Sequence, residues 1–191
     1  MIEVKSKRLF IGLGFSNSLA KELEPWLKKL KRFGDEKGLQ IKWSPPDNFH
    51  VTLVFLGPTS VGDLPTLQEK IAAAVAKHNC FSLKLDGISA LPELERGRVV
   101  YLDVQRSQKI LDLQGELESI LGRPNEQGYF PHLTLGRLRN TASCRDFLSP
   151  VRNANLGKQL VNSVSLFESI QTGPFSIYKP LQRFDLKPSE T

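Results

Sequence analysis

Two strand-like runs of the chain carry the same four-residue pattern: histidine, an apolar residue, threonine and leucine. The first occupies residues 50–53 within NFHVTLVFLGP, and the second occupies residues 132–135 within YFPHLTLGR. Because side chains alternate between the two faces of a strand, each histidine shares a face with its threonine. Val51, Leu53 and Phe55 are expected on the opposite, buried face of the first strand. The chain is thus expected to contain two half-buried strands, each presenting an imidazole beside a hydroxyl.

The composition limits the kind of protein that such strands belong to. At 191 residues, with 40% hydrophobic and 24% charged residues, the chain is long enough for one core or two small lobes and is typical of soluble globular proteins. No apolar run reaches the roughly 18 residues of a membrane span, and the start MIEVKSKRLF lacks the apolar core of a signal peptide, so we expect a cytoplasmic protein.

Cysteine content and charge give two further limits. Only Cys80 and Cys144 are present, without CxxC spacing, which indicates neither a disulfide framework nor a zinc site. The net charge of +6 favours an anionic partner without identifying it.

Three segments place apolar residues at the three-and-four spacing of helices, and several others have the composition of strands. We predict helices over residues 18–33, 64–78 and 107–121, a short helical turn over 144–151, and strands over 81–85, 98–104, 161–170 and 175–186. Gly122 is expected to end the third helix, and Gly173 with Pro174 to form the turn between the last two strands. Consecutive strands with short connections favour an α+β fold over a doubly wound parallel sheet. The similar order of strand, helix and histidine pattern in each half indicates an internal duplication.

Two other features have structural explanations that need no ligand. The run KKLKR at residues 28–32 falls mostly on the outer face of the first helix, where we expect solvated charges rather than a nucleic-acid patch. His78 is expected to end the second helix, because an imidazole there meets the negative end of the helix dipole.

If the two strands face each other across a groove, the repeated pattern brings two imidazoles and two hydroxyls together. With an ordinary pKa of about 6.5, one histidine can be neutral while the other is protonated, as general base and general acid catalysis require. Thr52 and Thr134 can donate hydrogen bonds to phosphoryl oxygens. The residues therefore indicate phosphodiester cleavage by His50 and His132 without a metal.

Other interpretations of these residues stay open. A duplicated structural feature would also repeat the pattern. A metal site would want carboxylates or further histidines, which neither pattern contains, and the chain has no GxSxG elbow for serine chemistry. A threonine nucleophile would need a base aimed at its hydroxyl. The histidine on the same face would then serve that hydroxyl and could not act separately as an acid or base on the substrate.

Four blocks, in order across nearly the whole chain, resemble the two-histidine (2H) phosphoesterases. They are RLFIGL, WSPPDNFHVTLVFLG, FPHLTLGR and SLFESIQTGP, and they are most similar to RNA 2′,3′-cyclic phosphodiesterases, also called 2′-5′ RNA ligase-like proteins. This resemblance implies that residues 1–191 form a single bilobal α+β domain. Two pseudo-symmetric lobes with antiparallel sheets would surround a central groove, with helices on the outside.

The same resemblance implies hydrolysis of an RNA 2′,3′-cyclic phosphate end, or of a small cyclic nucleotide, to a 2′-phosphate by a monomer that needs no cofactor and no metal. His50 would be the proton donor and His132 the proton acceptor, although the sequence alone leaves this order open. Thr52, Thr134 and Arg137 would bind the phosphate. Strict alternation puts Arg137 on the face opposite His132, so its role requires a bulge, a strand end or a long reach back.

Two other functions use the same residues. Reversible joining of RNA ends through a 2′-5′ linkage would need the same groove, and an RNA-end-binding module without turnover would need the same contacts. Trp43, Tyr101 and Phe130 are candidates either for stacking on a base or for packing in the core.

Overall fold

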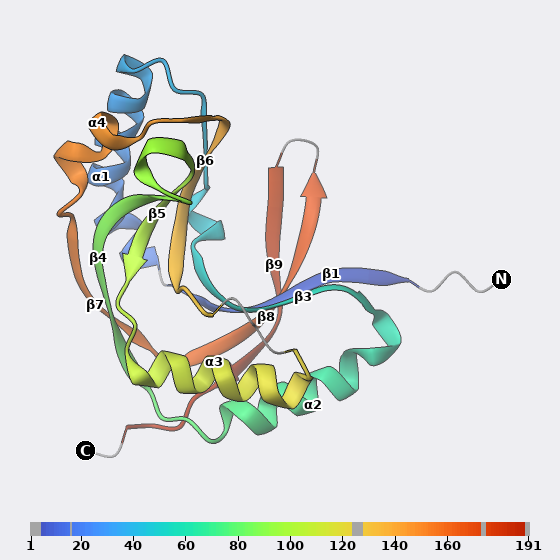
Figure 1. Ribbon diagram of the computed structural model, residues 1–191. Helices are drawn as coiled ribbons and strands as arrows, with labels where there is room; N and C mark the ends of the chain where they lie inside the picture. The colour runs from blue at the N-terminus through green and yellow to red at the C-terminus, as the bar shows by residue number, and fades with distance from the viewer. Residues whose placement is uncertain (1–4, 16, 124–127, 173–174, 190–191) are drawn as a thin grey trace.

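The computed structural model describes residues 5–15, 17–123, 128–172 and 175–189. Nine strands, four α-helices and several short 3₁₀ turns make up the described chain (Figure 1). Their bounds are β1 Ser6–Gly14, α1 Asn17–Glu36, β2 Ile41–Trp43, β3 His50–Ser60, α2 Leu64–Val75, β4 Phe81–Leu91, β5 Gly97–Val104, α3 Gln108–Leu121, β6 His132–Ala142, α4 Arg145–Leu148, β7 Asn155–Val161, β8 Ser163–Thr172 and β9 Phe175–Asp185. The predicted α+β class is confirmed.

All the named strand pairings are antiparallel, and the strands follow the order β7-β4-β5-β6-β3-β1-β8-β9, with β2 added beside β6. β3 and β6 meet at a single register position, Val51 opposite Leu133. The strand path therefore divides into two halves, β6-β5-β4-β7 and β3-β1-β8-β9, each with one histidine strand at the joint. These halves correspond to the two lobes that the resemblance implied.

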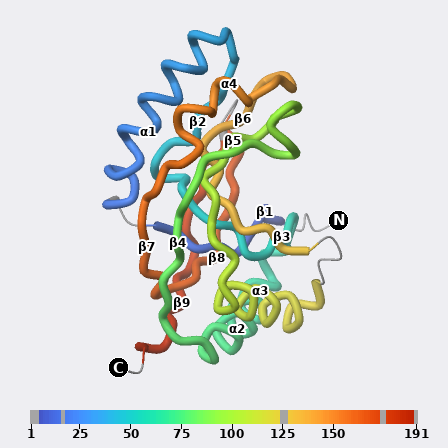
Figure 2. The backbone as a smooth tube through the Cα atoms, turned by 60° about the vertical axis from the view of Figure 1, so that its left-hand side comes forward, coloured from blue at the N-terminus to red at the C-terminus, as the bar shows by residue number. Residues whose placement is uncertain are grey.

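The helices cover the two halves separately (Figures 1 and 2). Helices α2 and α3 pack against each other and contact β9 and β3, whereas α1 contacts α4 and β7. Helix α1 follows β1 but contacts β7 of the other half, and α3 follows β5 but contacts β3 of the other half. The two halves are therefore interleaved along the chain.

Helix α1 forms where the apolar spacing predicted it. Leu19, Leu23 and Leu30 are fully buried, and Leu27 is nearly so, which gives one buried stripe along the helix. Pro25 lies inside the helix and does not end it. Gly122 follows α3 with φ 60, a left-handed conformation that glycine adopts without a steric cost, so the predicted helix end is confirmed.

Two predictions of element bounds need correction, and two strands were missed. Helix α2 ends at Val75, so His78 lies beyond the helix rather than in its last turn; its Nε2 is buried without a hydrogen-bond partner. Strand β4 continues to Leu91 because Gly87, with φ 93, lets the chain pass through an irregularity in the pairing with β5. Strands β2 and β7 were not predicted. The turn predicted at residues 173–174 lies outside the described residues.

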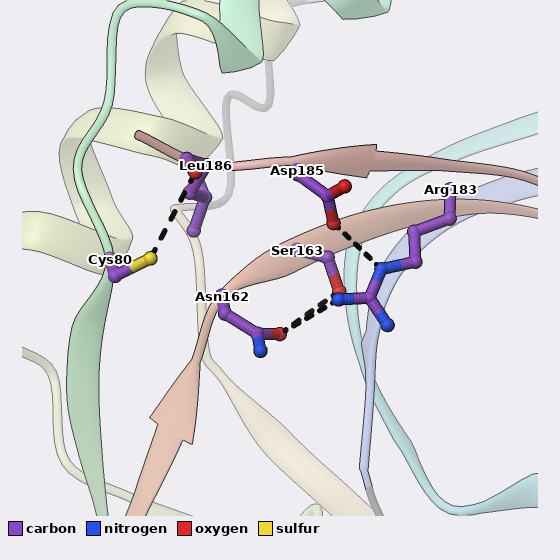
Figure 3. A network of polar contacts seen from close by, with 6 residues as sticks. All are labelled: Cys80, Asn162, Ser163, Arg183, Asp185 and Leu186. Atoms are coloured by element: carbon purple, nitrogen blue, oxygen red, sulfur yellow. Dashed lines mark hydrogen bonds and ion pairs between the residues drawn. The ribbon is translucent and has the colours of Figure 1, made fainter. Parts of the chain in front are cut away.

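A one-residue link, Asn162, carries the chain from β7 of one half into β8 of the other. Its Oδ1 accepts hydrogen bonds from Arg183 Nη2 and Ser163 Oγ at 3.3 Å each, while Arg183 Nε donates to Asp185 Oδ1 at 2.8 Å (Figure 3). This network fixes the link against the end of β9. None of the described helices is both long enough and apolar enough to cross a membrane.

Candidate active site

A groove of about 640 Å³ lies where the two halves of the sheet meet. All five residues that the sequence predicted for the site are among those that line it, namely His50, Thr52, His132, Thr134 and Arg137. The structure thus brings together residues from two strands whose sequences are far apart, as the repeated pattern required.

His50 is the first residue of β3 and directly follows a 3₁₀ turn and Phe49. Its Nδ1 lies 2.7 Å from the main-chain oxygen of Asn48, and its Nε2 lies 3.1 Å from Thr52 Oγ1. Because a carbonyl oxygen only accepts, Nδ1 must donate, and the neutral ring therefore carries its proton there. Nε2 is left as the nitrogen that gains or loses a proton on the groove side, beside the threonine hydroxyl.

His132 repeats this arrangement at the start of β6. Its Nδ1 lies 2.9 Å from the main-chain oxygen of Phe130, also two residues earlier in the chain. The same reasoning assigns the Nδ1–H tautomer to the neutral ring and leaves Nε2 for chemistry. Both imidazoles are therefore oriented by a main-chain oxygen of the segment that leads into their own strand.

The environment of His50 favours the neutral ring in the ligand-free protein. The pKa of His50 is lowered from 6.5 to about 4, chiefly by burial and also by the nearby positive charges of His132 and Arg137, while the hydrogen bond to Asn48 opposes this shift. Neutral His50 accepts a hydrogen bond from Thr52 at Nε2.

Arg137 reaches the groove because β6 contains a bulge. Val100 pairs with Gly136 and Tyr101 pairs with Thr134, so Leu135 is an extra residue without a partner in β5. The bulge reverses the alternation beyond it. Arg137 is exposed and lines the groove with His132. Of the three routes that the sequence analysis named for Arg137, namely a bulge, a strand end or a long reach back, the bulge is the one observed.

Strand β3 has a bulge at the equivalent position. Ile11 pairs with Val54 and Gly12 pairs with Thr52, which leaves Leu53 as the extra residue. Phe55 therefore occupies in β3 the place that Arg137 occupies in β6. The prediction that Phe55 is buried is wrong: its exposed fraction is 71%, and it lines the groove.

Aromatic rings hold each histidine ring in place. The centroids of Phe10 and Tyr178 lie 4.8 Å and 4.9 Å from that of His50, the latter at an interplanar angle of 84°. On the other side, Tyr101 is 7% exposed and meets His132 edge-on, while Phe130 stacks on His132 with centroids 5.7 Å apart. These contacts limit the rotation of both imidazoles.

Asn48 was missed by the sequence analysis, which took the catalytic and phosphate-binding residues from the two histidine patterns and Arg137. Its side-chain Nδ2 donates to Ser176 O at 2.7 Å, and its Oδ1 accepts from Tyr178 N at 3.2 Å. Asn48 therefore joins the turn before β3 to the main chain of β9, while its own carbonyl orients His50. The side-chain amide within WSPPDNFH was the available signal.

Comparisons with known proteins agree with this arrangement. The sequence matches the 2′-5′ RNA ligase superfamily over residues 19–171. The chain belongs to this superfamily. An RNA 2′,3′-cyclic phosphodiesterase of Methanothermobacter thermautotrophicus is 30% identical over 153 residues, which cover 77% of this chain and 83% of that protein. Another with that name, from Archaeoglobus fulgidus, is 27% identical over 182 residues, covering 93% of this chain and 99% of that protein.

Solved structures of other proteins have the same fold as this superfamily member. A Thermus thermophilus protein aligns with a TM-score of 0.77 at 22% identity, covering 96% of this chain and 100% of its own. E. coli LigT complexed with 3′-AMP aligns with a TM-score of 0.75 at 22% identity, covering 95% of this chain and 99% of its own. The predicted relation to the 2H phosphoesterases is confirmed.

The charge of the groove in this 2′-5′ RNA ligase superfamily member suits an anion. Arg8, Lys42 and Arg137 are exposed and line it, and the described lining residues include no aspartate or glutamate. Arg8 and Arg137 come from β1 and β6, on either side of β3. A negatively charged group between the histidines is therefore attracted from both halves of the sheet.

Proposed function

We propose that the protein hydrolyses RNA 2′,3′-cyclic phosphate ends, or small cyclic nucleotides, to 2′-phosphates. The observation that carries the proposal is the pair of histidines in one groove, each with Nδ1 bound to the main-chain oxygen two residues before it. The names of the curated relatives support the reaction class.

The proposed step transfers two protons in one displacement at phosphorus. His132 Nε2 accepts a proton from water as the water oxygen bonds to phosphorus, and His50 Nε2 donates a proton to the 3′ oxygen as the bond between phosphorus and that oxygen breaks. The 2′ ester bond remains, which gives a 2′-phosphate. Exchange of protons with solvent then restores both rings.

Thr52 and Thr134 are proposed to donate hydrogen bonds to the two non-bridging phosphate oxygens. Each lies on the same face of its strand as its histidine, so the hydroxyls approach the phosphate from both halves. Arg137 is proposed as a charged donor that stabilises the negative charge of the transition state, since its planar fork matches phosphate oxygens.

The reaction is proposed to need neither a metal nor another cofactor. Within the described ranges, no three His, Cys, Asp or Glu side chains lie close enough together to hold a metal ion. The imidazole pair and the cationic lining can supply the proton transfers and charge stabilisation that a metal would otherwise provide.

One observation favours the reverse assignment of the two histidines as a second candidate. Because burial lowers the pKa of His50 to about 4, His50 is neutral near neutral pH in the free protein and is then a proton acceptor. The proposed donor role requires the bound phosphodiester to raise that pKa, which a negative charge between the rings does.

The repeated geometry of β3 and β6 supports a proposal about the domain organisation. We propose that residues 1–191 form one bilobal domain that arose by internal duplication, since β3 and β6 share the histidine contact, the bulge and the burial pattern. The protein is proposed to act as a cytoplasmic monomer. Cys80 and Cys144 are both free, as a reducing compartment requires.

The first experiment incubates the protein, in excess EDTA, with an RNA that ends in a 2′,3′-cyclic phosphate. Wild type is expected to produce only the 2′-phosphate, and His50→Ala and His132→Ala are each expected to lose on the order of 10²–10⁴-fold in turnover. Near-full activity in either variant would remove the two-histidine mechanism. RNA binding without any product would favour the binding module, and joined 2′-5′ products would favour ligation.

A second experiment separates the acid from the base. A phosphodiester of 4-nitrophenol releases a leaving group that needs no protonation, so the variant that lacks the general acid retains activity on it. If His50 is the donor, His50→Ala is rescued on this substrate and His132→Ala is not. The opposite result would establish the reverse order.

A further inference from the structure

A second groove, of about 660 Å³, runs along helix α1 outside the histidine site. None of the five proposed catalytic and phosphate-binding residues lines it. Its wall comes from one face of α1, from the segment after β2 and from β9. The lining residues are Ala20, Lys21, Glu24, Leu27, Lys28, Lys31, Trp43, Ser44, Pro45, Pro46, Ser176 and Ile177.

The α1 groove adjoins the histidine groove. Both are lined by Trp43, Ser44, Pro45 and Ser176, which form the boundary between them. Trp43 is held there by the pairing of β2 with β6, in which it lies opposite Gly136, next to the bulge that positions Arg137. A strand that extends from the histidine site across these shared residues would reach the α1 groove.

Three exposed lysines give the α1 groove a positive wall. Lys21, Lys28 and Lys31 all line the groove, and the rise along the helix from Lys21 to Lys31 is about 15 Å. The acidic residue beside them, Glu24, pairs with Lys28 at 2.8 Å, but both side chains are well exposed, so this pair is readily exchanged for a ligand phosphate.

The opposite wall is apolar. Ile177 is 52% exposed, and Trp43 is half-buried with part of its flat ring available. Positive charge on one side and an aromatic surface on the other is the combination by which proteins hold single-stranded nucleic acid, with phosphates on the cations and bases on the ring.

We propose that the α1 groove binds the nucleotides on the 5′ side of the terminal cyclic phosphate, as a single strand. The inference rests on the proposed function, because it takes the terminal phosphate to lie between His50 and His132. Of the two substrates that the proposed function allows, it selects RNA strands of several nucleotides, which bind better than a cyclic mononucleotide that fills the histidine groove alone.

The structure also separates the members of the KKLKR run, which the sequence analysis treated together as a solvated face. Lys28 and Lys31 line the groove, whereas Lys29 Nζ lies 4.9 Å from the centroid of the Trp26 ring and Arg32 lies over the Phe33 ring. The same helix therefore supplies both test positions and control positions.

The test compares two variants that lose the same charge. Lys21→Gln/Lys28→Gln/Lys31→Gln changes the groove wall. Lys29→Gln/Arg32→Gln/Lys37→Gln changes three exposed cations at or just beyond α1 that do not line it. Thermal unfolding establishes that both variants are folded. Each is assayed on a 2′,3′-cyclic mononucleotide and on an oligoribonucleotide that ends in a 2′,3′-cyclic phosphate.

Both variants are expected to hydrolyse the mononucleotide as wild type does, and only the groove variant is expected to lose activity on the oligonucleotide. Each phosphate contact of a single strand contributes about 0.7 to the slope of log affinity against log salt concentration. With three such contacts, wild type is expected to lose about 20-fold more affinity for the oligonucleotide than the groove variant does between about 50 and 200 mM salt. The control variant is expected to keep the wild-type slope.

Two failures are distinguishable. If wild type hydrolyses both substrates equally well, or if both variants lose equally on the oligonucleotide, the strand-binding groove is wrong and the proposed hydrolysis stands. If wild type hydrolyses neither substrate, the proposed function is wrong. Fluorescence anisotropy with a 3′-phosphorylated oligonucleotide then tests the groove alone, and equal affinity of the two variants would overturn it.

Discussion

Acid pH is expected to destabilise the protein through His50. The pKa of His50 is 6.5 in an unperturbed side chain and about 4 in the folded protein. Between these values the unfolded chain binds a proton that the folded protein does not, so the free energy of unfolding falls as the pH falls. The stability is fully present above about pH 6.5 and is lost on approaching about pH 4.

The size of this effect follows from the pKa difference. Each pKa unit corresponds to about 1.4 kcal/mol, so the shift of His50 corresponds to a loss of about 3 kcal/mol across this range. That is a large part of the total of about 5–15 kcal/mol that is typical of folded domains. The effect is therefore large enough for equilibrium unfolding to resolve.

The contribution of His50 to the pH dependence of stability is measured by urea unfolding of wild type and His50→Gln at a series of pH values. The variant removes the titrating ring, and carboxylates that titrate at acid pH contribute equally to both proteins. The difference in unfolding free energy between them is expected to change by about 3 kcal/mol between about pH 6.5 and about pH 4. Parallel pH curves would refute the reasoning that burial keeps His50 neutral.

Three substitutions test other parts of the groove. Asn48→Ala removes two hydrogen bonds to β9 and is expected to cost about 2 kcal/mol, or about 4–8 °C in the thermal midpoint, and an unchanged midpoint would contradict the anchoring role. Arg137→Ala is expected to lower turnover of a cyclic phosphate by about 10²-fold with partial recovery in Arg137→Lys, whereas equal loss in both variants would mean that geometry rather than charge is needed. Phe55→Ala is expected to change stability by less than about 0.5 kcal/mol, since the side chain is exposed, but to raise the KM of a nucleotide about fivefold or more through lost base stacking; an unchanged KM would exclude that contact.

Local periodicity predicted the helices well because their burial depends on residues of the same segment. Leu19 and Leu30 are both buried at positions that the spacing alone identified. The unpredicted strands have weaker local signals. β2 has only three residues and β7 contains Gly157 with φ 68, and both exist through pairing with β6 and β4. A single segment does not contain that information.

Strand alternation predicted the histidine and threonine positions but failed one step further along each strand. It placed Phe55 in the core and Arg137 on the wrong face, because an extra residue, Leu53 or Leu135, interrupts each strand between the threonine and the third residue beyond it. The bulges arise from the register against β1 and β5, so they are tertiary features. The HxTx patterns were readable from the sequence, whereas the residues that complete the groove required the pairing.

The contact of Val51 with Leu133 has a mechanical consequence. These residues lie between histidine and threonine in each strand, so the joint between the two halves of the sheet coincides with the reacting groups. Any change in the angle between the halves displaces atoms in proportion to their distance from that pivot. The outer strands and α1 have long lever arms, and the imidazoles have short ones. A rotation of one half against the other about this joint would therefore change the rim of the groove more than the separation of the two histidines.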